Sequence, residues 1–182
     1  MPMIHRLRRS PRSRRAFTLI EVVVTAAVLF IGLLAMTSTS WVVHSLRGTN
    51  QDKQIAQQAL QGVIEDLYAQ SELARESDDG WSVALTDVFA PGNPGATFNV
   101  QGLDPWVGEP TVGTLTMILD ETRTDADLGV QVGMPRDLNG DGAVNDADVT
   151  DDAVLIPVIV QLRWRGEAGN RQLRQCLYLL SY

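Results

Sequence analysis

The chain has 182 residues, of which 45% are hydrophobic, and a formal net charge of −7. Six arginines and no acid lie in the first sixteen positions, so the remainder holds nine basic against twenty-two acidic residues, a net charge of −13. This acidic remainder argues against a nucleic-acid partner, because binding to phosphates depends on lysine and arginine. The single cysteine excludes an internal disulfide, and two histidines leave little for acid–base catalysis. With no nucleophile elbow, zinc-ligand spacing or phosphate-binding loop either, we expect no enzymatic activity.

The basic N-terminus is followed by an apolar run, residues 17–43, which contains one charge, Glu21. As a helix, this run measures ~40 Å, which is enough to cross a ~30 Å hydrocarbon core. Positive charge before the span and acid after it predict a cytoplasmic N-terminus and a translocated C-terminal domain. A carboxylate within a span costs ~2.5–3.5 kcal/mol at the helix centre and less near the ends, so Glu21 needs a cationic partner.

A cut between Ala16 and Phe17 would supply that cation. The new α-amino group of Phe17 is charged at neutral pH. Phe17 and Glu21 are four residues apart and lie on one helix face. In a stack of identical or similar helices, Glu21 of one subunit would therefore reach the Phe17 amine of its neighbour.

A basic leader, a small residue, Phe-Thr-Leu-Ile-Glu and an apolar helix together resemble the type IV pilin and type II secretion pseudopilin family. Family members usually have glycine before the cut, where this chain has Ala16. The resemblance implies that a prepilin peptidase removes residues 1–16 and N-methylates Phe17. The subunit then leaves the bacterial inner membrane, through the assembly platform, for a filament of pilin or pseudopilin subunits in which Glu21 meets a neighbour's amine. The sequences at 31–34 and 164–166 most resemble PilV-class minor pilins, with the I-type minor pseudopilins as the nearest alternative.

Three other interpretations remain open. A secretory signal fits poorly, because the apolar run is too long and begins with an acid. A twin-arginine export motif matches only in part, since Thr18 and Leu19 depart from it. A membrane-anchored calcium-binding domain that forms no filament is the main alternative, and it predicts an uncut N-terminus.

Residues 44–76 are predicted to continue the helix as an amphipathic segment that ends at 77–80. The apolar positions recur every three or four residues: Ile55, Ala59, Leu60, Val63, Ile64, Leu67 and Ala74. Opposite them lie polar residues, so one face is expected to pack on a domain and the other to face solvent.

Residues 77–182 are predicted to form the folded domain, and the residues after Gly80 are predicted to form strands and loops. We expect strands at 97–100, 114–120, 154–165 and 172–180, the last two as a hairpin with a loop of about five residues. In the 154–165 strand, Val158, Val160, Leu162 and Trp164 share one face. A sheet of three to five antiparallel strands on the second half of the helix makes the fold α+β, and the pilin family has this layout.

A calcium-binding loop is predicted at 137–148. Oxygen-bearing residues recur at the spacing that wraps a Ca²⁺ ion, with the backbone carbonyl of the seventh residue as a further ligand: Asp137, Asn139, Asp141, Ala143, Asn145 and Asp148. Gly142 takes the sixth position, where the chain turns sharply, and Asp148 replaces the usual glutamate at the twelfth. We expect the ion to fix the loop before the 154–165 strand, without a sensor-like opening. The other nearby acids do not follow this ligand spacing, and we expect them to be solvated charges in loops: Asp125, Asp127, Asp151 and Asp152.

Overall fold

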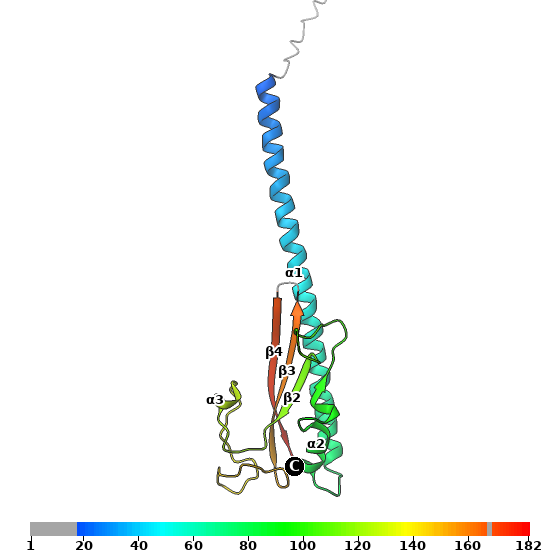
Figure 1. Ribbon diagram of the computed structural model, residues 1–182, viewed down its shortest axis with the longest axis vertical. Helices are drawn as coiled ribbons and strands as arrows, with labels where there is room; N and C mark the ends of the chain where they lie inside the picture. The colour runs from blue at the N-terminus through cyan, green and yellow to red at the C-terminus, as the bar shows by residue number, and fades with distance from the viewer. Residues whose placement is uncertain (1–17, 167–168) are drawn as a thin grey trace, which may run out of the picture. The chain divides into compact units, whose positions relative to one another are not determined.

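The computed structural model describes residues 18–166 and 169–182 (Figure 1). The chain divides into two compact units, Met1–His44 and Ser45–Tyr182. Helix α1 (Leu19–Ala74) supplies the helical part of the first unit and the first element of the second. The predicted helix over 17–43 and 44–76 is therefore confirmed from Leu19 to Ala74, while residues 75–76 form a turn and Phe17 lies outside the described residues.

Within the first unit, α1 is apolar around its whole circumference. Leu19–Ser38 is long and apolar enough to cross a membrane, judged by length and composition. Two of its hydroxyl groups bond back to the preceding turn: Thr25 Oγ1 donates to the Glu21 carbonyl at 2.6 Å and Thr37 Oγ1 to the Leu33 carbonyl at 2.9 Å. Thr25 and Thr37 carry the only side-chain hydroxyls of residues 19–37. Because both hydroxyls donate to carbonyls of the same helix, neither is left as an unpaired donor facing lipid.

In the second unit, α1 buries one face against the folded domain. Leu60, Leu67 and Ala74 are buried as predicted, and Ile55, Val63 and Ile64 pack on them from the rim. Ala56 is the most buried residue of the helix, with no exposed surface, although its small side chain carries only a weak apolar signal in the sequence. The predicted amphipathic pattern therefore marks the packed face of the helix correctly.

The segment directly after Gly80 is helical, whereas strands and loops were predicted there. Helix α2 (Trp81–Phe89) buries Trp81, Leu85 and Phe89, which are spaced four residues apart and so share one helix face. Trp81 Nε1 donates to the carbonyl and the hydroxyl of Ser71 at 3.2 and 3.0 Å, and this holds α2 to the end of α1. The helix is only nine residues long, so its apolar spacing is hard to tell from that of a strand. A 3₁₀ turn, η1 (Pro94–Ala96), follows it.

The sheet has four antiparallel strands in the order β1-β2-β3-β4. Their bounds are β1 (Thr97–Phe98), β2 (Gly113–Met117), β3 (Leu155–Gly166) and β4 (Gly169–Leu180). The predicted strand number and the α+β, pilin-like fold are confirmed. Val158, Val160, Leu162 and Trp164 are all buried, and they belong to the core cluster that contains the packed residues of α1.

The hairpin of β3 and β4 is longer than predicted, and its predicted five-residue loop is wrong. The ladder runs from the Leu155–Leu180 pair to the Gly166–Gly169 pair, so only residues 167–168 connect the strands. The extension was not predicted because glycine and polar residues are typical of loops, although here they pair within the ladder: Gly166, Gly169, Asn170 and Arg171. Gly169 has φ of 103°, a conformation that glycine adopts without strain, and this allows the tight reversal.

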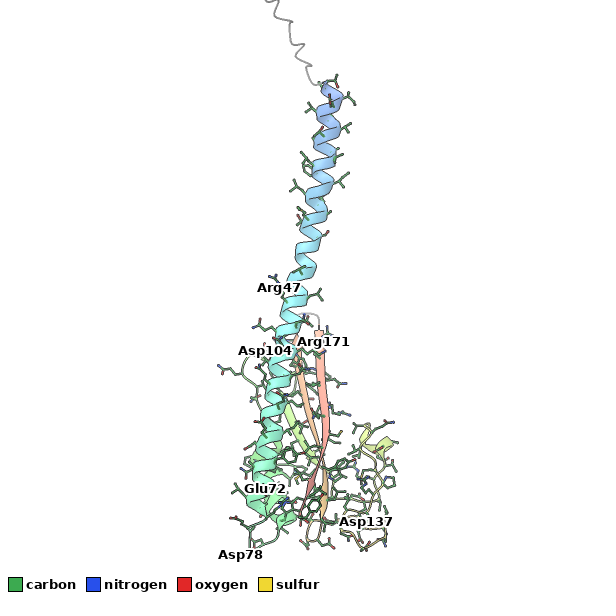
Figure 2. All side chains as sticks on the ribbon, turned by 180° about the vertical axis from the view of Figure 1, so that it is seen from behind. Arg47, Glu72, Asp78, Asp104, Asp137 and Arg171 are labelled. Carbon is green, nitrogen blue, oxygen red and sulfur yellow. The ribbon has the colours of Figure 1, made fainter. Side chains whose placement is uncertain are left out.

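The long connection from β2 to β3 contains a short helix, α3 (Asp125–Leu128), and the predicted calcium loop. β4 forms one edge of the sheet, and this connection passes on the same side of it (Figure 1). Figure 2 shows Asp137 near the end of the domain where Glu72 lies and Arg171 near the other end.

Candidate functional site

Of the N-terminal candidate residues, only Glu21 lies within the part of the chain that the structure describes, which begins at residue 18. Ala16 and Phe17 lie outside the described residues. Glu21 lies in the first turn of α1, where its backbone N–H donates to the Thr18 carbonyl at 3.0 Å and is near the Thr18 hydroxyl at 3.4 Å. Thr18 therefore begins the helix in the manner of a cap, and Glu21 is fixed in the first turn.

The Glu21 carboxylate is exposed and has no ion-pair partner among residues 18–166 and 169–182. A negative charge in the first turn is favoured by the helix dipole, by about 0.3–1 kcal/mol in water. This gain is smaller than the cost of a carboxylate at the centre of a membrane span. A cation from outside the described chain would therefore stabilise this group further.

The apolar residues around Glu21 are exposed as well, on all sides of the helix. More than half of the surface of each large side chain is accessible in this stretch: Leu19, Ile20, Val22, Val23, Val24, Val28, Leu29, Phe30, Ile31, Leu33, Leu34 and Met36. A helix that is apolar all round is stable only when lipid or other helices surround it.

The second candidate site is the loop of residues 137–148. Asp137 Oδ1 accepts the N–H of Gly140 at 2.6 Å and Oδ2 that of Gly142 at 2.9 Å. Asp141 Oδ1 accepts the N–H of Ala143 at 2.7 Å. Gly142 has φ of 89°, so the sharp turn predicted at the sixth position is present. The first half of the loop thus winds around the carboxylates of its first and fifth residues.

The remaining loop residues have further partners. Asn139 Oδ1 accepts the N–H of Asp141 at 3.1 Å, and its amide nitrogen lies 3.3 Å from carboxylate oxygens of Asp146 and Asp152. Asp148 Oδ1 accepts from the hydroxyl and the backbone N–H of Thr150 at 2.6 and 3.0 Å. The hydroxyl bond, followed by the backbone bond, lowers the pKa of Asp148.

The donor set of the loop consists of oxygen atoms only: carboxylates of Asp137, Asp141 and Asp148, amides of Asn139 and Asn145, and the Ala143 carbonyl. Calcium prefers such oxygen ligands, so the chemistry of the predicted residues fits this ion. Within the described part of the chain, no group of three or more histidine, cysteine, aspartate or glutamate side chains is close enough to hold a metal ion. The carboxylates instead face the amides of their own loop, as described above.

Glu121, which the sequence did not single out, is the residue that holds this loop to the domain. It has no exposed surface. Its Oε1 accepts the N–H groups of Leu138 and Asn139 at 2.6 and 3.3 Å, and its Oε2 accepts that of Asp146 at 3.4 Å. Its own N–H donates to the Asp146 carbonyl at 3.0 Å. One buried carboxylate therefore joins both arms of the loop.

Asp125 and Asp127 have structural roles, contrary to the expectation of solvated charge. Asp125 accepts the backbone N–H groups of Val132, Gly133 and Met134 at 2.9, 3.1 and 2.9 Å. The N–H of Met134, then that of Val132, lowers the pKa of Asp125. Asp127 forms a capping box with Thr124 at the start of α3, and the Thr124 hydroxyl lowers its pKa. Each carboxylate replaces a missing backbone acceptor in this connection.

Residues 11–37 match the family model of the prokaryotic N-terminal methylation motif. No curated protein and no solved structure matches the chain. The matched segment contains Ala16, Phe17 and Glu21 and extends into the apolar part of α1. Together with the pilin-like α+β fold, this N-terminal match supports a precursor of the pilin or pseudopilin type, and the motif implies interaction with a prepilin peptidase and with other pilin subunits.

Proposed function

We propose that the chain is a minor subunit of a type IV pilus or a type II secretion filament, cleaved between Ala16 and Phe17 and assembled through α1. The observation that supports this most is the methylation motif leading directly into an apolar helix whose only charge to residue 38 is Glu21. A simple membrane anchor gains only the small helix-dipole stabilisation from a carboxylate at this position. A helix that packs against copies with a free α-amino group does gain from it.

The proposed assembly interaction joins Glu21 of one subunit to the Phe17 amine of the next. Both groups would be charged at neutral pH, and methylation leaves the amine charged. Removing an isolated charge from water costs several kcal/mol, and pairing with the opposite charge offsets this cost. The pair would therefore fix the axial position of one helix against another, while the exposed apolar side chains of α1 supply the contact area.

The intact mass of the protein purified from its native membrane tests this function directly. Cleavage and methylation predict a chain that begins at methylated Phe17. A chain that still begins with Met1 would contradict the proposal and favour the membrane-anchored alternative. The cytoplasmic N-terminus and extracytoplasmic domain that the proposal requires can be tested in the same membranes, by protease treatment from either side.

Within this family, we propose that the chain belongs with the PilV-class minor pilins, on the sequences at 31–34 and 164–166. Both segments are in regular structure, the first inside α1 and the second at the end of β3. Co-purification of the tagged chain with its filament, at a small fraction of the main subunit, would support the minor role. An abundance equal to that of the main subunit would contradict it.

We also propose that the loop of residues 137–148 binds a structural Ca²⁺ ion. Support comes from its all-oxygen donor set and from the turn at Gly142. Glu121 further holds the two arms of the loop at a fixed spacing. In this proposal Asp137, Asn139, Asp141, Asn145 and Asp148 hold the ion with their side chains, and Ala143 with its carbonyl. Extracellular calcium modules have Kd values of ~10⁻⁴–10⁻³ M, which suits a permanent clip outside the cell.

A further inference from the structure

We propose that the cavity between α1 and the end of the β3–β4 hairpin binds a phosphate group. The cavity has a volume of about 270 Å³ and is lined by residues of all three elements. Sites for drug-sized ligands measure about 300–1,000 Å³, so this cavity suits a smaller group. Figure 2 shows one of the lining residues, Arg171, at the end of the domain away from Asp137 and the loop that contains it.

The fold places the lining residues on facing surfaces of α1 and the hairpin. Trp164 and Arg171 pair directly in the β3–β4 ladder, so their side chains lie on the same face of the sheet. Trp164 belongs to the core cluster that contains the packed residues of α1, so this face is the one toward the helix. On α1, Lys53 lies three and seven residues before the buried Ala56 and Leu60 and continues their row. Lys53 and Arg171 therefore border the cavity from opposite sides.

The two cations of the cavity, Lys53 and Arg171, have no acidic partner in the part of the chain that the structure describes. Acids are abundant, since twenty-two of them follow residue 16 together with only nine basic residues. Three other arginines do pair with acids: Arg75, Arg163 and Arg165. Two unpaired cations that border one cavity in so acidic a chain indicate an anion that comes from outside the chain.

Asp52 is the only acid among the described lining residues, and it pairs with neither cation. Its Oδ2 lies 3.2 Å from the position that a Cβ atom on Gly166 would take, so the carboxylate rests against the end of the hairpin. The described lining residues therefore carry a net charge of +1, which favours an anion over a cation. The amides of Asn50 and Gln172 add uncharged donors to the lining.

The indole of Trp164 gives a second, independent reason to expect a ligand. The residue is only 4% exposed, and its Nε1 has no hydrogen-bond partner within residues 18–166 and 169–182. By contrast, the indole N–H groups of Trp81 and Trp106 donate to protein oxygens. A buried N–H without an acceptor is rare, and a bound ion is one explanation for it. A phosphate oxygen in the cavity would give Trp164 the acceptor that it lacks.

A phosphate group fits these donors better than a carboxylate does. A carboxylate offers two oxygens, whereas a phosphate offers more and can accept from both cations and from neutral donors at once. Arginine binds phosphate with two parallel hydrogen bonds, and lysine binds it as a point charge. Inorganic phosphate and the head group of a phospholipid share this chemistry, so each is a possible source of the group.

Titration of the full chain with inorganic phosphate tests the inference, in an uncharged maltoside detergent with sodium chloride to keep the ionic strength constant. We expect the indole ¹⁵N–¹H signal of Trp164, identified with Trp164→Phe, to shift and saturate, while the signal of Trp81 stays in place. Sodium chloride alone should give no saturating shift. A phosphate titration without a saturating shift of Trp164 would overturn the inference, unless the head-group titration below gives one.

Glycerophosphoglycerol, the water-soluble head group of an anionic phospholipid, distinguishes the two sources of phosphate. Tighter binding of this compound than of inorganic phosphate would assign the cavity to a lipid head group. Weaker binding would assign it to free phosphate. Either result supports the inference, and the absence of saturable binding by both compounds would overturn it.

Four variants locate the binding on the protein. Lys53→Gln and Arg171→Gln each remove one cation of the cavity, and each should weaken phosphate binding about tenfold. Arg123→Gln, which removes an exposed cation outside the cavity, should leave the affinity unchanged. Asp52→Asn removes the acid from the lining and should strengthen binding about threefold, a gain that a loosened fold would not give. Wild-type affinity in the two cation variants, or no gain with Asp52→Asn, would overturn the inference.

Discussion

Glu121 Oε1 accepts the backbone N–H of Leu138 at 2.6 Å, and neither residue has exposed surface. Seventeen positions separate them. This bond and its neighbours at Asn139 and Asp146 make Glu121 the internal support of the acidic loop. Because water cannot reach the site, the N–H of Leu138 has no substitute acceptor if the carboxylate is removed.

We therefore predict that Glu121→Leu lowers the free energy of unfolding by about 2–3 kcal/mol, since it leaves the buried N–H of Leu138 and the half-buried N–H groups of Asn139 and Asp146 without their acceptor. Glu121→Gln keeps one acceptor oxygen and should cost less. Thermal or urea unfolding of the two variants measures the difference, with the exposed Glu65→Gln as the control. Equal stability of the wild type and Glu121→Leu would show that the carboxylate is not the support of the loop.

For the proposed calcium ion, we predict that chelation with EDTA lowers the Tm of the domain. At a Ca²⁺ concentration about 100-fold above the Kd, binding contributes about 2.7 kcal/mol, which corresponds to a shift of about 5–10 °C. Asp137→Ala and Asp141→Ala should lower the Tm in calcium and abolish its response to EDTA. Asp151→Ala, an exposed acid outside the ligand phase, should keep the full response. A melt that EDTA leaves unchanged would rule out the ion.

For the proposed assembly, we predict that Glu21→Ala is still cleaved before Phe17 but does not enter filaments. The peptidase acts before assembly, whereas the Glu21–amine pair forms only between subunits. Mass spectrometry of the membrane fraction reports the cleavage, and immunoblots of sheared filaments report the incorporation. Glu65→Ala, which removes an acid from the amphipathic part of α1, serves as the matched control. Normal incorporation of Glu21→Ala would remove the role assigned to this residue.

Asp125 should make the stability of the domain depend on acid pH. Its pKa is lowered in the folded state by the N–H groups of Met134 and Val132, so its contribution is fully present above the ordinary aspartate pKa. This contribution is lost as the pH falls through the lowered pKa. We expect the wild type to lose more stability than Asp125→Asn between about pH 5 and pH 2 in urea melts. Asp87→Asn, an exposed acid, should follow the wild type.

The sequence predicted the elements whose signal is local and repeated. The α1 helix shows an unbroken apolar run followed by a regular apolar stripe, and both the helix and its packed face were predicted correctly. Helix α2 was missed because nine residues hold only three apolar anchors, Trp81, Leu85 and Phe89. The hairpin end was missed because Asn170 and Arg171 pair with Arg165 and Trp164, and polar residues at an exposed strand end resemble loop residues.

The candidate sites divide in the same way. The phase of the acidic loop and the position of Glu21 are local patterns, and both can be read from the chain. Glu121 lies sixteen residues before the loop and has no neighbouring motif, so only the fold shows that it contacts Leu138. The cavity beside Trp164 was also invisible, because it depends on the pairing of Trp164 with Arg171 and on residues of α1 that are distant in sequence.

The C-terminal end of α1 contacts the end of strand β4, which comes more than a hundred residues later in the sequence. Arg75 donates to the Leu180 carbonyl at 2.9 Å, and Leu67 and Ala74 share a core cluster with Leu177 and Leu179. The two partners are 105 residues apart in the sequence, so this face of α1 is fully covered only when β4 has paired with β3. A chain in which that pairing fails would expose part of the apolar face, and we expect such a chain to be degraded by proteases.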